Sequence, residues 1–406
     1  MARTKKRAVW IALEVDGSNN PVFGVDPSAD GSGYKYVPAV VVGDLVPERK
    51  LLEAPVATGT TWATAPIPGP DGASLQLEVP LSGLASACGA GTNASSVTDD
   101  YLDLLARHIF TTAATVAGVA VGTGSTGSNL VLASDPTGYD AQQLVPIFET
   151  AKPTTGVRAL WALLNNSTGP TFTAVTPAMD YSPTNAAIAY GTKTYLPSDS
   201  GGPTIALAYK LDGVIYRLLG GRVTQASIVG ELDGFWRLKI TISFDSKADD
   251  TSGKTALPAV TRFTRFQKVL LSPFWFNGTK YSTRKIEIDL AITAAVVGAT
   301  DAVNGRAGHE SIAMGPKVMV EPQFAETWNT LRDAQTEGRV LVQFGSGALS
   351  GGVLNAGAFH IEAATVRDAK LADENGRQRH AIMLETVTSL THTSGDASRV
   401  CQYVRA

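Results

Sequence analysis

The stretch that decides the fold runs from Pro203 to Phe244 and reads PTIALAYKLDGVIYRLLGGRVTQASIVGELDGFWRLKITISF. Asp212-Gly213 separates two runs of β-branched and aromatic residues, and it favours a hairpin because a type I′ turn needs φ > 0 at both central positions. The last run, 235–244, alternates apolar and polar residues with the period of a strand that has one buried face. Its apolar members are predicted to form the core of an antiparallel meander: Trp236, Leu238, Ile240, Ile242 and Phe244. The meander has a fixed register and no catalytic set of residues.

The composition favours a folded, mainly β protein. Hydrophobic residues make up 44% of the 406 residues and charged residues 17%, which supports a sizeable core and excludes a disordered chain. The 40 Gly and 21 Pro residues indicate many turns. A net charge of −3 gives no reason to expect general binding of polyanions. Cys88 and Cys401 are far apart in the sequence, so we expect no disulfide framework and a reducing compartment.

Three further segments are informative near the N-terminus. Val9, Ile11, Leu13 and Val15 share one face of a strand pattern, and Glu14 and Asp16 cut the apolar run short, which favours a strand over an export signal. Residues 46–70 are rich in proline and have few alternating apolar positions, so we predict an extended loop there. An apolar stripe with helical spacing follows Thr98 and predicts a helix that ends near residue 109.

Residues 110–170 differ in amino-acid composition from the rest of the chain. They are rich in Thr, Gly, Ser and Ala and contain short strand-like runs. We interpret them as an inserted β-rich segment between two parts of one β domain, 1–109 and 171–406. Their longest uncharged run is broken throughout by Gly and Thr, which argues against a membrane span.

Motifs that carry chemistry are weak in this sequence. Gly122–Gly127 matches G-x-G-x-x-G, but Asp135-Pro136 leaves no room for the helix that a dinucleotide site needs, so a β turn is favoured. Asp26–Gly31 resembles half of a calcium loop, yet Val37 stands where the bidentate Glu would be. The five His residues have no metal-like spacing, and no activated nucleophile is evident. We therefore expect no enzyme activity, no metal and no cofactor.

Five fragments, in this order along the chain, carry a resemblance to a known family: Phe23–Pro27, Leu75–Gly89, Ala208–Phe244, Lys285–Leu290 with Asn304-Gly305, and Phe359–Val366 with Ala381–Val387. Together they resemble the tail tube (major tail) proteins of long-tailed bacteriophages. Each fragment alone is a structural motif without chemistry. The chain is longer than the usual member, and residues 110–170 have no counterpart in the family pattern.

The resemblance implies a tail-tube-type β-sandwich or barrel subunit with a flanking α-helix. Six copies would close into a ring by pairing their sheets, which removes the free edges of the meander, and rings would stack into the tube that conducts DNA. The implied partners are further copies of the chain and the terminator, baseplate and tape-measure proteins of the tail. DNA would pass without specific binding, no membrane is involved, and the location is the virion tail, assembled in the host cytoplasm.

The tube architecture predicts where two segments of the chain lie. The 46–70 arm would reach an adjacent subunit or ring, and its candidate contacts are Pro47, Leu51, Leu52, Pro55, Trp62 and Pro66. The 110–170 segment would decorate the exterior, because an insertion into the lumen would obstruct DNA.

The electrostatics of DNA passage select candidates for the lumen wall. A basic wall would hold phosphates by counterion release, so acidic or neutral walls are expected. Glu78, Glu287 and Asp289 lie on alternating strands and are the lumen-lining candidates. The same reasoning sends Arg237 and Lys239 to the outside or to an intersubunit pair.

Two other functions remain open at this point. One is another virion component of related fold, such as a tail terminator or a baseplate hub. The other is a carbohydrate-binding β-sandwich module, for which the stacking platforms would be Trp62, Trp161, Trp236, Trp275 and Trp328. Negative-stain images separate the three, because they predict long tubes, single rings and monomers.

Overall fold

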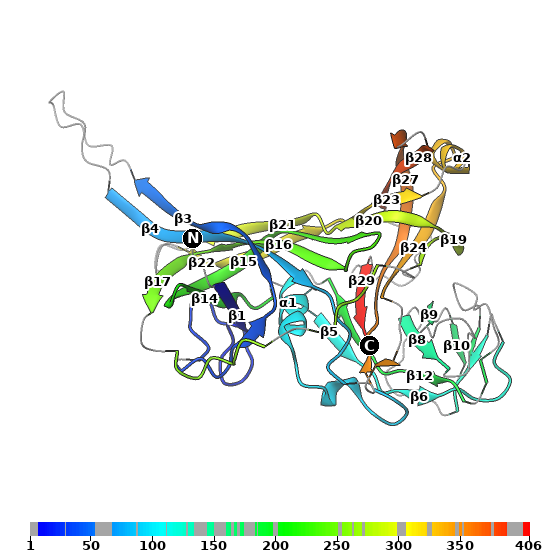
Figure 1. Ribbon diagram of the computed structural model, residues 1–406, viewed down its shortest axis with the longest axis horizontal. Helices are drawn as coiled ribbons and strands as arrows, with labels where there is room; N and C mark the ends of the chain where they lie inside the picture. The colour runs from blue at the N-terminus through cyan, green and yellow to red at the C-terminus, as the bar shows by residue number, and fades with distance from the viewer. Residues whose placement is uncertain are drawn as a thin grey trace, which may run out of the picture.

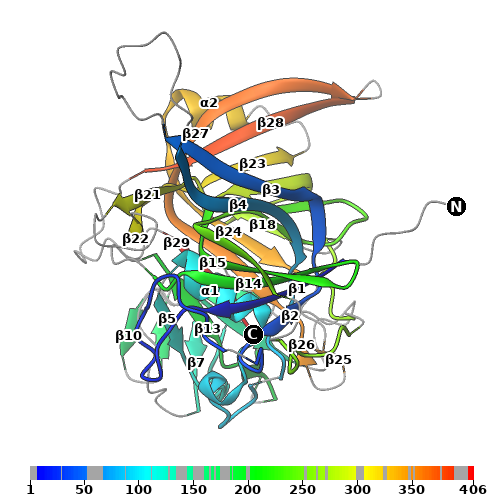
Figure 2. The same cartoon turned by 90° about the vertical axis from the view of Figure 1, so that its left-hand side faces the viewer.

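The computed structural model describes residues 7–28, 30–52, 67–86, 88–110, 112–126, 129–133, 144–149, 160–163, 166–168, 171–173, 183–184, 186–197, 202–250, 254–261, 264–269, 273–298, 306–322, 327–345, 349–350, 353–374, 377–387 and 401–406. The fold is mainly β and is dominated by one large antiparallel sheet, as the composition and the meander predicted. Helix α1 (Tyr101–Phe110) lies on the buried side of this sheet, as expected for the predicted helix (Figures 1 and 2).

The predicted hairpin is present and its turn has the expected backbone. Strands β14 (Ile205–Leu211) and β15 (Val214–Glu231) flank Asp212 with φ 51° and Gly213 with φ 99°. Strand β15 does not stop at Gly220-Gly221, as the sequence suggested, but bends there. Its first half pairs with β14 and β17 (Ser246–Asp250), and its second half with β16 (Arg237–Phe244) and β20 (Thr283–Asp289).

Glycine is required at this bend for two separate reasons. Gly220 has φ +66°, in the region that favours glycine. A Cβ on Gly221 would lie 2.5 Å from the ring of Phe244, so the neighbouring strand leaves no room for a side chain. The two glycines let one strand serve two parts of the sheet.

A continuous run of strands, which we call the long sheet, forms the centre of the molecule. In spatial order it contains β3 (Val40–Leu52), β4 (Ile67–Pro80), β16, β15, β20, β23 (Lys317–Pro322), β28 (Arg377–Thr386) and β27 (Gly357–Glu374). One face is buried, and the five predicted core residues of the meander, Trp236, Leu238, Ile240, Ile242 and Phe244, all lie in it. Trp236 packs edge-on against Phe344 with ring centroids 4.7 Å apart.

Further strands complete the fold around this core. Strands β1 (Arg7–Leu13) and β2 (Lys35–Val37) extend from β14, which confirms the predicted N-terminal strand. The N-terminal half of β27, residues 357–365, pairs with β24 (Glu337–Phe344) on one side and β29 (Cys401–Arg405) on the other. The remaining elements here are β5 (Thr112–Thr115), β13 (Lys193–Leu196), β18 (Phe274–Phe276), β19 (Thr279–Tyr281), β21 (Ile292–Gly298), β22 (Arg306–Met314), β25 (Leu349–Ser350), β26 (Val353–Leu354), α2 (Thr327–Asp333) and the 3-10 turn η1 (Ala94–Ser96).

The inserted segment has different limits from those predicted. Strand β5 pairs with β13 of the main fold, so residues 112–115 do not belong to the insertion. The described strands between 119 and 189 form two small sheets that are separate from the large one: β6 (Val119–Ala120), β7 (Leu130–Val131), β8 (Leu144–Phe148), β9 (Leu160–Leu163), β10 (Asn166–Thr168), β11 (Thr171–Thr173) and β12 (Ile188–Ala189). The inserted segment packs on the main fold through Leu144 and Phe148, which join a cluster with Trp275 and Val404.

The predicted 46–70 loop is, in its described part, a pair of strands. Strands β3 and β4 continue past the body of the protein as an antiparallel ribbon (Figure 1). Pro47 lies opposite Ala73, and Leu51 and Leu52 lie opposite Pro68 and Ile67. The segment therefore pairs with itself, which its proline content concealed, because prolines are tolerated on an edge strand. Pro55, Trp62 and Pro66 lie outside the described residues.

Candidate functional surface

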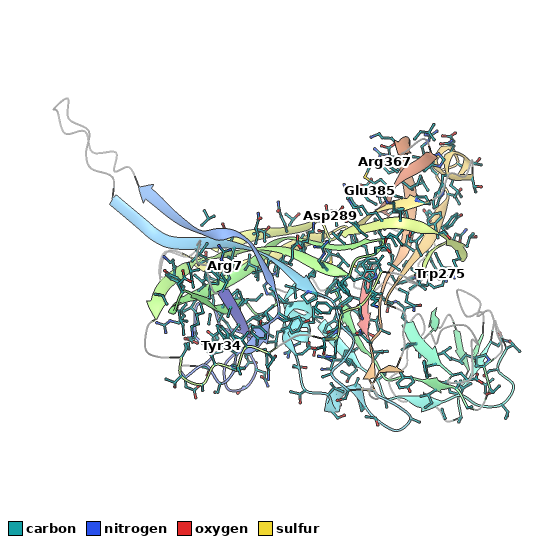
Figure 3. The ribbon with its side chains drawn as sticks, in the orientation of Figure 1. Arg7, Tyr34, Trp275, Asp289, Arg367 and Glu385 are labelled. Atoms are coloured by element: carbon teal, nitrogen blue, oxygen red, sulfur yellow. The ribbon has the colours of Figure 1, made fainter. Side chains whose placement is uncertain are left out.

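The exposed side of the long sheet carries polar residues in transverse register, and we call it the polar face. From β4 onward, the residues opposite one another are Glu78, Lys239, Ser227, Asp289, Lys317 and Glu385. Because side chains alternate along a strand, these six share a face that is opposite to core residues such as Ile240 and Ile288. Asp289 and Glu385 lie along this side together with Arg367 of β27 (Figure 3).

A groove of about 620 Å³ lies on the polar face over β4, β16, β15 and β20. Its lining includes Gln76, Glu78, Ser227, Lys239, Glu287 and Asp289. The three lumen candidates, Glu78, Glu287 and Asp289, are therefore brought together from two strands that are distant in the sequence. The sequence missed Lys317 and Glu385, although the alternation of residues 317–322 was a signal for the first.

Positive and negative charges on the polar face are paired, and this corrects the expected separation of signs. Arg237 Nη1 lies 2.8 Å from Glu78 Oε2, and Lys239 Nζ lies 3.6 Å from the other oxygen of the same carboxylate. Arg237 and Lys239 are thus on the same face as Glu78. The predicted separation of Arg237 and Lys239 from Glu78 was wrong, because the strands were considered one at a time, whereas the register sets Lys239 directly opposite Glu78. Whether this face lines the channel stays a prediction.

Similar pairs continue across the face. Lys285 Nζ is 3.4 Å from Glu287 Oε2, and Lys317 Nζ is 3.0 Å from Glu385 Oε1. Arg367 Nε is 3.8 Å from the second oxygen of Glu385. Pairs of this kind in partly exposed positions contribute little to stability, about 0–1 kcal/mol each. Their consequence is that each basic side chain of β16, β20 and β23 on this face lies beside a carboxylate, and the acidic residues are in slight excess.

A second group of charges is buried where β29 meets helix α1. The guanidinium of Arg405 is fully buried and all its nitrogens donate. Nη1 donates to Asp100 Oδ1 at 2.9 Å and Asp103 Oδ1 at 2.5 Å, and Nη2 donates to Asp100 Oδ2 at 2.7 Å. Backbone carbonyls of Ser82 and Gly83 accept from Nε and Nη2. Burying this charge is tolerated because every donor has an acceptor.

Lys193 and Tyr195 of β13 complete what we call the Arg405 cluster, with Arg405, Asp100 and Asp103. Lys193 Nζ lies 3.5 Å from Asp103 Oδ2, and the Tyr195 hydroxyl donates to Asp103 Oδ1. Burial would raise the pKa of Asp103, but Arg405, then Lys193 and the Tyr195 hydrogen bond, hold this pKa below its usual value. The carboxylate is therefore ionised inside the fold, and the cluster is structural in its present state.

The calcium-like loop at Asp26 contains an internal cation. The ammonium of Lys254 lies 2.6 Å from Asp26 Oδ2, contacts the carbonyl of Ser28, and stands 5.1 Å from the centre of the Tyr34 ring. Burial opposes ionisation of Asp26, but Lys254 outweighs it and lowers the pKa of this carboxyl. The loop therefore folds around a lysine from a distant part of the chain.

The other sequence motifs have structural roles. Residues 122–126 form a turn with Ser125 bonded to Val131, and the next described element is strand β7 rather than a helix. His108 bridges the carbonyl of Pro203 and the amide of Val223. Within the described residues, no group of three His, Cys, Asp or Glu side chains is arranged to hold a metal.

Most of the proposed carbohydrate platforms are inaccessible. Trp236, Trp275 and Trp328 are buried in hydrophobic clusters, so they cannot stack on a sugar. Trp62 and the side chain of Trp161 lie outside the described residues. The carbohydrate-binding interpretation therefore loses three of its five candidate platforms.

Comparison with known proteins gives no further guidance. No family model matches the sequence, and no curated protein matches it either. Among the described residues, no helix is long and apolar enough to cross a membrane. Function must therefore be inferred from the polar face, the edges of the long sheet and the buried charges.

Proposed function

We propose that the chain is a structural subunit of a phage tail tube, in which six copies form a ring and the rings stack around a channel for DNA. The observation that carries this proposal is the polar face. It is wide and continuous over several antiparallel strands, and its basic side chains lie beside carboxylates. A surface of this kind suits a wall along which a polyanion slides.

The charge balance of the polar face supports passage of DNA rather than binding. Six acidic and four basic residues with described side chains share the face of strands β4 to β28: Glu78, Glu231, Glu287, Asp289, Glu321 and Glu385 against Arg237, Lys239, Lys285 and Lys317. A basic wall would hold phosphates by releasing counterions, and an acidic one would repel them. Paired charges leave few free cations for phosphates and keep the wall hydrated.

The edges of the long sheet support closure into a ring. Among the described residues, no strand pairs with the outer edge of β3, nor with residues 366–374 of β27 on the side away from β28. These edges lie at opposite ends of the same sheet. Long unpaired edges invite pairing with another chain. Joining β3 of one copy to β27 of the next would continue the polar face from subunit to subunit around a closed barrel.

The test is to image the purified full-length chain by negative stain and weigh its assemblies by native mass spectrometry. We expect hollow tubes and multiples of six. Single rings that never stack would favour a tail terminator, and monomers under all assembly conditions would refute the proposal.

Two proline substitutions, Val41→Pro and Val42→Pro, provide a matched pair. Neighbouring residues of an edge strand direct their N–H groups to opposite sides, so one variant loses a bond to β4 and the other a donor of the free edge. The free-edge variant should remain folded but not assemble. Normal tubes from both would show that the β3 edge is not the contact.

A further inference from the structure

The last strand, β29, occupies a slot between strands that come from distant parts of the sequence. It pairs with β27 on one side, where Cys401 lies opposite Ile361, and with β13 on the other, where Val404 lies opposite Thr194. All five of its residues are buried. The slot is therefore built entirely by the rest of the chain, and β29 fills it as an extended peptide fills a sheet-edge binding site.

The slot contains a preformed pocket for an arginine. Asp100 and Asp103 cap helix α1 reciprocally: the amide of Asp103 donates to Asp100 Oδ1, and the amide of Asp100 donates to Asp103 Oδ2. The amide of Leu102 also donates to Asp100 Oδ1. These bonds hold both carboxylates in place without Arg405. Because a guanidinium matches two oriented carboxylates with several donors at once, the pocket selects arginine over lysine.

The pocket has partners even without β29. Lys193 lies 3.5 Å from Asp103, and Tyr195 donates to the same carboxylate. An empty slot therefore leaves Asp103 paired rather than as an isolated buried charge. The slot can therefore exist without a bound strand.

The covalent connection to β29 is much longer than the gap it spans. The amide of Val387, just after β28, donates to the carbonyl of Ala363, and Cys401 lies opposite Ile361. The chain thus leaves and rejoins the same side of β27 only two residues apart, about 7 Å. Residues 388–400 connect these points, and a chain of that length spans about 40 Å when extended and about 20 Å on average when flexible.

We infer that the slot is a strand-exchange site, which accepts β29 from a second copy of the chain in the assembled state. This inference rests on the proposed self-assembly. A β29 from a neighbour makes the same backbone pairs and the same arginine contacts as the chain's own strand, so the exchange has no cost in contacts. Where assembly holds a neighbouring slot within the reach of residues 388–400, the effective concentration of the two strands is comparable. Exchange then links neighbouring subunits noncovalently through a buried strand.

Disulfide trapping on both sides of β29 tests this inference in the full-length chain. One variant carries Thr194→Cys and Val404→Cys in a Cys88→Ser, Cys401→Ser background, which changes side-chain volumes little. The second carries Ile361→Cys against native Cys401 in a Cys88→Ser background. Each is assembled under reducing conditions, oxidised, and run on a denaturing gel without reductant. Single-cysteine versions are the controls, and near-ultraviolet circular dichroism checks the fold.

Strand exchange predicts covalent dimers and higher multiples from both variants, with none from the controls. Intrachain disulfides alone, seen as monomers of increased mobility, would overturn the inference. If those monomers come from tubes visible in the microscope, the tube proposal stands while the exchange fails. If no tubes form from the unmodified chain, the tube proposal itself fails, so the two failures are distinguishable.

Discussion

The Arg405 cluster and the polar face use the same residue types at similar distances and have opposite consequences. Arg405 donates to Asp103 at 2.5 Å and has no exposed side-chain surface, whereas Arg237 donates to Glu78 at 2.8 Å with 41% of its side chain exposed. In the Arg405 cluster, water is excluded and each charge depends on its partner. On the polar face, water solvates either charge when the pair separates.

This difference indicates how charge is used in the two regions. Buried charges specify which strand occupies the slot, because a strand without arginine leaves Asp100, Asp103 and the carbonyls of Ser82 and Gly83 without the donors of Arg405. Surface charges contribute little to stability, so they can differ without loss of the fold. Their effect is on how the surface interacts with a passing polyanion. Mutations should therefore separate folding from function cleanly between the two regions.

The largest expected effect is that of Arg405→Gln. Removing the guanidinium leaves Lys193 as the remaining ionic partner of Asp103 and deprives the carbonyls of Ser82 and Gly83 of their donor, so the free energy of unfolding should fall by about 3 kcal/mol. Arg237→Gln is the matched control and should change it by about 0–1 kcal/mol. Denaturant unfolding of both variants measures the contrast, and equal losses would show that burial does not distinguish the two regions.

A pH effect of intermediate size is expected beside the slot. His360 on β27 is buried opposite Gln402 of β29, and burial, reinforced by Arg339, lowers its pKa to about 3. Between this value and the usual pKa of about 6.5, the unfolded chain binds a proton that the folded chain does not, so stability falls as the pH falls through this window. His360→Gln should flatten the dependence of stability on pH between about 6.5 and 3. Parallel curves for the two proteins would contradict the assignment.

The smallest effect on stability and a clear effect on function are expected on the polar face. Glu287→Lys combined with Asp289→Lys should change the free energy of unfolding by about 1 kcal/mol or less, because both side chains are partly exposed. The two substitutions make each subunit more positive by four charge units. The new lysines should hold DNA phosphates and slow ejection from assembled particles, most strongly at low salt. Ejection that is unchanged at all salt concentrations would show that these residues do not line the channel.

The sequence was sufficient wherever the pattern is local. The Asp212-Gly213 turn, the alternation of residues 235–244 and the helical stripe after Thr98 each depend on neighbours within a few residues, and each was predicted correctly. Errors arose where pairing is distant. The prolines of 46–70 concealed a ribbon whose two strands are separated in the sequence, and the limits of 110–170 missed that β5 pairs with β13.

Thus the sequence by itself determined the β class, the central hairpin and the buried face of the meander, because strand periodicity and turn chemistry act over short distances. Only the tertiary structure decided that Lys239 faces Glu78, that Lys254 fills the loop at Asp26, and that Arg405 enters a pocket made by Asp100 and Asp103. Each of these joins residues far apart in the chain. Their pairing depends on sheet register and on burial, and neither is encoded by the spacing of residues along a single strand.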